Sequence, residues 1–200
     1  MSALEQFAKA HGFEYRSGGE LEGPFSVFRL GSGGRATGIV RGALPDGRAT
    51  TVAAYACTGR GPGGDAEDLS FTVAISELPE TAATLPWLEC LSREAEIAGG
   101  PRAEAAPGMR EVPLESEFFE QRFLLLAGPG TDRSAVVELF APSFLHWYAY
   151  EAPFGMTMEL IGGRLCAYTP DTMERPGHLD SFWDSVATIA AQIGAEALEA

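Results

Sequence analysis

Short strand-like segments joined by tight turns constrain the fold of this chain more than any other feature of its sequence. Residues 69–75 alternate apolar and polar side chains, the period of a strand with one buried face. Residues 37–43 and 49–57 are also strand-like, and the Leu-Pro-Asp-Gly sequence between them is typical of a tight turn. We expect residues 25–28 to be a further strand and the glycine-rich residues 31–34 a loop. Strands with connections this short form an antiparallel meander.

The second half of the chain continues with strands. Residues 85–91 fit an edge strand or a short helix, and the early proline favours the strand. Residues 120–127 end in an apolar run typical of a buried strand. Two strand-like segments, residues 156–161 and 164–169, flank a Gly-Gly pair, which is typical of a two-residue hairpin turn.

Helical spacing of apolar residues appears in four places. Residues 3–11 follow a capping box, and residues 133–140 follow Thr131-Asp132, either of which can cap a helix. A second short helix begins at Pro142. Residues 177–198 give the most regular amphipathic pattern. The sequence therefore predicts an α+β fold: a mostly antiparallel sheet of about eight or nine strands, helices packed on one face, and a long amphipathic C-terminal helix.

The length of 200 residues suits a single globular domain, residues 1–200. A stretch rich in Gly, Pro and Ala, residues 99–108, also allows two sub-lobes, residues 1–98 and 109–200. The pattern leaves open whether the two halves form one sheet or two.

Net charge excludes several classes of partner. The chain carries 14 Lys and Arg against 28 Asp and Glu, a net charge of −14. Nucleic acids and anionic lipid surfaces bind clustered positive charge, so neither is an expected partner. The N-terminal residues lack the pattern of a signal peptide, and no window approaches a membrane span. We therefore expect a soluble cytoplasmic protein without membrane insertion.

Motifs for catalysis or cofactor binding are absent from the sequence. The cysteines Cys57, Cys90 and Cys166 are widely spaced in apolar contexts, which indicates buried thiols rather than a metal site. Accordingly, no catalytic, cofactor-binding or metal-binding residue is predicted. An enzyme stays a minor alternative, using Ser143 and His146 or the carboxylates of residues 111–120.

Acidic and aromatic residues gather between residues 111 and 154. Glu111, Pro113, Glu115 and Glu117 alternate as they would on one face of an extended segment, and a dense aromatic group follows. Packing of the aromatic group in the core is one interpretation, and exposure as an interaction surface is the other. The residues predicted for such a surface are Trp147, Tyr150, Phe154, Glu115 and Glu117.

Three segments together resemble a group of uncharacterised bacterial proteins common in actinobacterial-type genomes. They are residues 117–123 (EFFEQRF), 139–147 (LFAPSFLHW) and 159–165 (ELIGGRL), and Leu85-Pro86-Trp87-Leu88 also fits. The resemblance covers roughly residues 68–198 and implies no known activity and no catalytic residue.

Three functional hypotheses follow from the sequence. The favoured one is a non-enzymatic acidic protein that binds a protein partner or a small ligand. The second is an immunity-like or secretion-chaperone-like protein that covers a basic partner, because complementary charge speeds association. The third is a hydrolase-type enzyme. Neither the oligomeric state nor the identity of a partner follows from the sequence.

Overall fold

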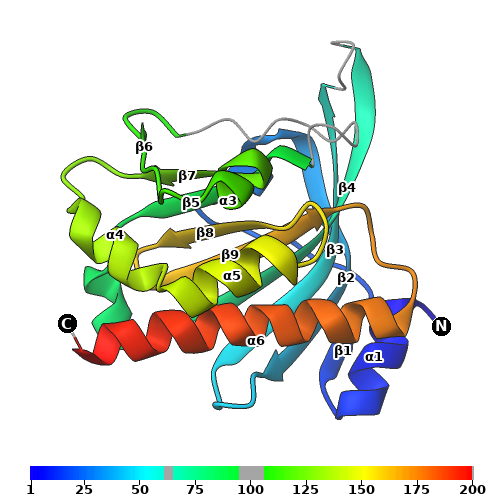
Figure 1. Ribbon diagram of the computed structural model, residues 1–200. Helices are drawn as coiled ribbons and strands as arrows, with labels where there is room; N and C mark the ends of the chain where they lie inside the picture. The colour runs from blue at the N-terminus through cyan, green and yellow to red at the C-terminus, as the bar shows by residue number, and fades with distance from the viewer. Residues whose placement is uncertain (61–64, 95–105, 200) are drawn as a thin grey trace.

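Strands from both halves of the chain form one antiparallel sheet, with helices across one side of it (Figure 1). The computed structural model describes residues 1–60, 65–94 and 106–199. The strands are β1 (Glu14–Arg16), β2 (Gly31–Ala43), β3 (Ala49–Arg60), β4 (Ala66–Glu77), β5 (Leu88–Ser92), β6 (Arg110–Glu111), β7 (Phe123–Ala127), β8 (Thr157–Ile161) and β9 (Arg164–Pro170). The helices are α1 (Ala3–His11), α3 (Glu117–Arg122), α4 (Arg133–Leu139), α5 (Pro142–Tyr150) and α6 (Pro176–Glu199), with 3-10 turns η1 (Ser26–Arg29) and η2 (Glu80–Thr84).

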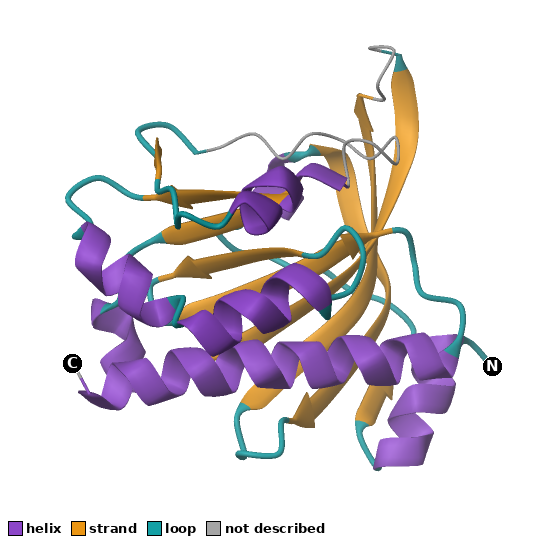
Figure 2. Ribbon diagram, viewed as in Figure 1, coloured by secondary structure: helices purple, strands orange, loops and turns teal. Residues whose placement is uncertain are grey.

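The nine strands have the order β1-β2-β3-β4-β9-β8-β5-β7-β6. The hairpin β8–β9 pairs with β4 on one side and β5 on the other, so strands from both halves share one sheet. This arrangement confirms the predicted α+β class (Figure 2). Strand β5 lies inside the sheet, not at an edge as one interpretation of its sequence had it, and all five of its residues are buried. The proposed linker, residues 99–108, lies mostly outside the described residues.

Further sequence expectations were wrong, among them the start of the strand expected at residues 120–127, because residues 120–122 belong to α3. Residues 26–28 lie in the 3-10 turn η1 and Phe25 is its N-cap, so this segment is not a strand: it crosses a face of the sheet with its apolar side chains packed on it. Residues 31–34 belong to β2 rather than to a loop. The acidic residues from 111 to 117 do not share one extended face, because Ser116 caps α3 and residues 117–122 are helical.

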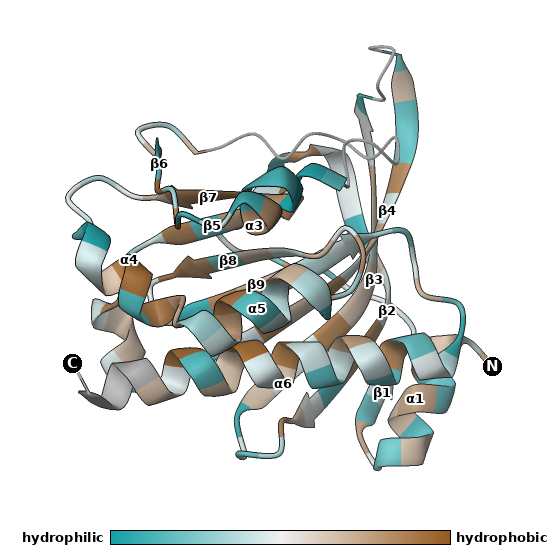
Figure 3. Ribbon diagram, viewed as in Figure 1, coloured by the Kyte–Doolittle hydropathy of each residue, from teal (hydrophilic) through white to brown (hydrophobic). Residues whose placement is uncertain are grey.

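The larger core lies between the sheet and the helices. It gathers apolar side chains from α1, α3, α4, α5 and α6 against one face of the strands. The stripe of α6 that the sequence predicted is fully buried there, at Leu179, Phe182, Val186, Ile189 and Ile193. Figure 3 shows the apolar residues concentrated on β5, β7 and β8 beneath these helices.

A smaller apolar cluster covers the other face of the sheet. Phe25 precedes η1 and Val27 lies in it, and both are fully buried. They pack against Tyr55 of β3, Phe71 of β4 and Tyr168 of β9. The segment around η1 is therefore a strap across this second face.

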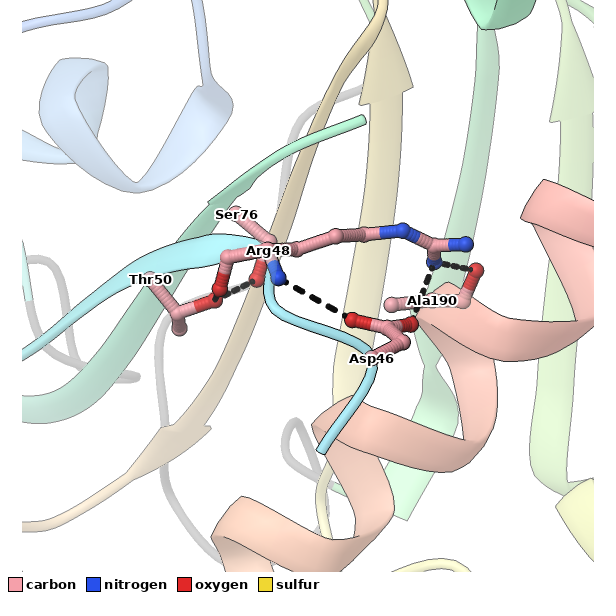
Figure 4. A network of polar contacts seen from close by, with 5 residues as sticks. All are labelled: Asp46, Arg48, Thr50, Ser76 and Ala190. Atoms are coloured by element: carbon pink, nitrogen blue, oxygen red, sulfur yellow. Dashed lines mark hydrogen bonds and ion pairs between the residues drawn. The ribbon is translucent and has the colours of Figure 1, made fainter. Parts of the chain in front are cut away.

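Arg48, in the turn between β2 and β3, ties the sheet to α6 (Figure 4). Its guanidinium donates to the carbonyl oxygen of Ala190 in α6 and pairs with Asp46 at 3.2 Å. The hydroxyls of Thr50 and Ser76 lie 2.7 Å apart beside it. The side chain of Arg48 is only 17% exposed, so its charge is satisfied mainly by these protein groups.

Arg48→Met should lower the free energy of unfolding by about 1–3 kcal/mol, because it removes hydrogen bonds made by a charged, largely buried group. Urea denaturation followed by tryptophan fluorescence measures the change. Arg16→Met is the control, since Arg16 is exposed on β1. Equal losses in the two variants would show that Arg48 does not hold α6.

Candidate functional site

Ser143 and His146 do not form a catalytic pair. Both side chains are exposed on α5. The imidazole of His146 packs on the ring of Tyr150, with centroids 4.6 Å apart, and no hydrogen bond joins it to Ser143 within the described part of the chain. The geometry therefore lacks the nucleophile–base contact that the hydrolase hypothesis requires.

The residues predicted for an interaction surface divide between core and surface. Trp147 is half-buried and stacks on Phe144, with centroids 5.9 Å apart, so it packs against the core. Tyr150 and Phe154 are 55% and 61% exposed. Glu115 and Glu117 are exposed as well.

The exposed aromatic group is completed by Phe118, which the sequence pattern did not single out. Its ring lies parallel to that of Tyr150, with centroids 4.2 Å apart and planes only 4° apart. Phe118 is 38% exposed. We call Phe118, His146, Tyr150 and Phe154, with the neighbouring Glu117 and Glu151, the α3–α5 surface. Helical phase could have found Phe118, because Phe119 faces the core and its neighbour must then face outward.

Arg122 fixes the two helices beneath this surface. Its guanidinium makes two hydrogen bonds to the carboxylate of Glu94, at 2.7 and 3.0 Å, and another to the carbonyl oxygen of Ala149 near the end of α5. It also lies 5.8 Å from the centroid of the Phe118 ring. The bidentate ion pair restrains α3 against Glu94, and the bond to Ala149 joins α3 to α5, so the aromatic pair is held in place before any partner arrives.

A cavity of about 370 Å³ lies elsewhere, between the start of α1, strands β2 and β3, and the residues before α6. Leu4, Gly38 and Ala54 are among its lining residues. Its volume is in the range of small-molecule sites. Two of its polar lining side chains are already engaged: the Ser2 hydroxyl accepts from the Glu5 N–H, and Gln6 donates to a backbone carbonyl.

Two glutamates that the sequence pattern did not single out are buried beneath η1. Glu89 of β5 and Glu159 of β8 are directly paired in the sheet register, and both are fully buried. Burial raises the pKa of Glu159 to about 7, against the opposing effect of hydrogen bonds from Ser26. Burial also raises the pKa of Glu89, opposed by the Ala106 N–H and by Arg29. Each is a single acidic residue inside an apolar strand, and this pattern is the sequence signal that could have identified them as buried glutamates.

Residues 1–60, 65–94 and 106–199, where their side chains are described, contain no group of three or more His, Cys, Asp and Glu side chains placed to hold a metal ion. None of their helices combines the length and apolar character of a membrane span. All three cysteines are buried, and burial raises the pKa of each thiol.

No family model and no curated protein matches this sequence. Among solved structures, the mycobacterial trehalose monomycolate transport factor A resembles it, with a TM-score of 0.61 and 16% sequence identity. The match covers 97% of this chain and 92% of the transport factor. At this identity the likeness extends to the fold of nearly the whole chain and to nothing finer.

Proposed function

We propose that this protein is a non-enzymatic binding protein that takes a basic protein partner on the α3–α5 surface. The observation that carries the proposal is the exposed, parallel stack of Phe118 and Tyr150. Large aromatic side chains are normally buried, and a rigid exposed pair is typical of a binding hot spot.

The charge around the stack favours a partner with arginine or lysine side chains. Glu117 and Glu151 adjoin the aromatic pair, and Glu115 is 85% exposed close to the start of α3. Aromatic faces attract cations, and adjacent carboxylates add ionic attraction. The resemblance to a transport factor supports a transport-related binding role, as an analogy at the level of the fold.

Tyr150→Ala is expected to weaken binding of the partner about tenfold or more, because it removes half of the stack. The partner is first captured in host cells by a photo-crosslinking residue placed at position 150, with the same residue at Val137 as control. Val137 is 40% exposed on α4, outside the α3–α5 surface. Affinity of the purified partner is then measured for the parent protein, Tyr150→Ala and Val137→Ala.

Salt provides a second readout of the same complex. Association with a basic partner should slow markedly as ionic strength rises, since surface charges steer the encounter. Crosslinks that form equally at positions 150 and 137, or a Tyr150→Ala variant that binds like the parent, would contradict the proposal. The cavity beside α1 would then be the stronger candidate site.

A further inference from the structure

We propose that the buried pair Glu89 and Glu159 retains one proton at neutral pH and that this proton latches the η1 strap onto the second face of the sheet. The strap is the segment from Phe25 to Arg29. The latch is independent of the α3–α5 surface, which lies over the opposite face.

The sheet register places Glu89 and Glu159 side by side. Glu89 and Glu159 are opposite each other on neighbouring antiparallel strands, where Cβ atoms are about 5 Å apart. Both side chains are fully buried. Two carboxylates this close in an apolar setting repel each other strongly, so the pair retains a proton.

The strap is bonded to this pair through Ser26. The N–H of Ser26 donates to both carboxyl oxygens of Glu159, at 3.0 and 2.9 Å, and its hydroxyl donates to Oε1. The same hydroxyl lies 2.9 Å from that of Tyr168. The N–H of Ala106 approaches Oε2 of Glu89 at 3.4 Å, whereas Oε1 of Glu89 has no hydrogen-bond partner among the described residues.

Few charges near the pair can compensate a second negative charge. Arg29 acts on both glutamates, but it is exposed and its guanidinium donates to the carbonyl oxygen of Pro24. From β9, Tyr168 and Cys166 are buried, and burial raises the pKa of both, so they stay neutral.

Beyond β7 on the same face, Glu111 lies 3.9 Å from Arg93, so that pair is internally balanced. Arg164, whose guanidinium lies 5.5 Å from the centroid of the Phe25 ring, pairs with Glu77 at 3.2 Å. Loss of this proton therefore leaves two buried negative charges that, among the described residues, only Arg29 offsets, and water must enter to solvate them.

Lifting the strap gives water a route to the carboxyl groups. Residues 20, 22, 23 and 24 before it are exposed, and the β2 ladder begins only at Gly31. Lifting the strap uncovers the apolar cluster of Phe25, Val27, Tyr55 and Phe71 while the strand pairing remains. Proton loss thus controls whether this face of the sheet is covered.

Hydrogen exchange of a peptide covering residues 20–30, read by mass spectrometry, tests the latch. Rates are divided by the intrinsic exchange rate at each pH. In the parent protein, protection of this peptide should fall about tenfold or more between about pH 6 and about pH 8. A peptide from the centre of β3 serves as the internal control. The same fall in both peptides would indicate global opening and overturn the proposal.

Two neutral variants keep the shape of the pair. Glu159→Gln and Glu89→Gln each remove one ionisable carboxyl, so each should reduce the pH dependence to less than about threefold. Glu14→Gln, at an exposed position of β1, should behave like the parent. Unchanged protection in the parent, or a full pH dependence in both variants, would overturn the latch.

Infrared spectroscopy detects a protonated carboxyl directly, whether or not the strap opens. The parent at neutral pH should show the carbonyl band of a protonated carboxyl, and the double variant Glu89→Gln/Glu159→Gln should lack it. Absence of the band in the parent would show that the pair retains no proton.

Discussion

Replacing Tyr148 with alanine is expected to lower the free energy of unfolding by about 3–5 kcal/mol. Tyr148 of α5 is fully buried. Its ring meets five other aromatic rings, with centroid distances from 4.9 to 6.3 Å: those of Phe119, Phe123, Phe140, Phe144 and Trp147. The truncated side chain leaves a cavity that rigid rings on α3, β7 and α5 cannot fill, so the loss combines transfer and cavity contributions.

Tyr148→Phe is the matched control and should change the free energy of unfolding by less than about 1 kcal/mol. The buried hydroxyl of Tyr148 has no hydrogen-bond partner among the described residues, and only the weakly polar thiol of Cys90 lies close to it. Removing that hydroxyl therefore breaks no strong hydrogen bond. Denaturation in urea measures both variants. A phenylalanine variant as unstable as the alanine variant would show that the hydroxyl, not the ring, is what the core requires.

Local signals predicted the elements whose ends are set by a particular residue. Ser2 accepts a hydrogen bond from the Glu5 N–H at the start of α1, and Asp132 accepts one from Ser134 at the start of α4. Pro142 is the first residue of α5, and Gly162-Gly163 makes the turn between β8 and β9. These features act over a few residues, so a single sequence carries them completely.

Elements set by distant partners could not be predicted in the same way. Gly31 and Gly34 suggested a loop, but they lie in β2. A Cβ atom at Gly34 would collide with the Tyr55 hydroxyl, and one at Gly31 with the Thr58 carbonyl. Glycine here permits close approach of a neighbouring strand, and only the tertiary structure reveals that neighbour.

The candidate sites follow the same division. Tyr150 and Phe154 were predicted from residue type alone. The stack of Phe118 on Tyr150 also requires α3, and the alternating glutamates had indicated an extended segment there instead of a helix. The Glu89–Glu159 pair depends on strands separated by about 70 residues in the sequence and on the strap that covers them. Pairings of this kind are decided by the register of the sheet, which a single sequence does not specify.

The contribution of Glu159 to the free energy of unfolding is expected to fall by about 3 kcal/mol as the pH rises from about 4.5 to about 7. The pKa of Glu159 is about 7 in the folded protein, against an ordinary value of 4.5. Between these values the folded state holds a proton that the unfolded state has lost. The contribution is therefore fully present below about pH 4.5 and is lost as the pH rises, at about 1.4 kcal/mol per pH unit.

Glu159→Gln removes this proton uptake, so its stability should change less with pH than that of the parent over the same range. Urea denaturation at a series of pH values gives both curves, and their difference cancels the titration of every group except Glu89, which is coupled to Glu159. Glu117→Gln, exposed on α3, should follow the parent. Parallel curves for the parent and Glu159→Gln would mean that the Glu159 carboxyl is ionised beneath the strap. If the parent and Glu159→Gln instead differ in stability near pH 7 but not at low pH, the destabilising charge requires the Glu159 carboxyl, because the two proteins differ at no other position.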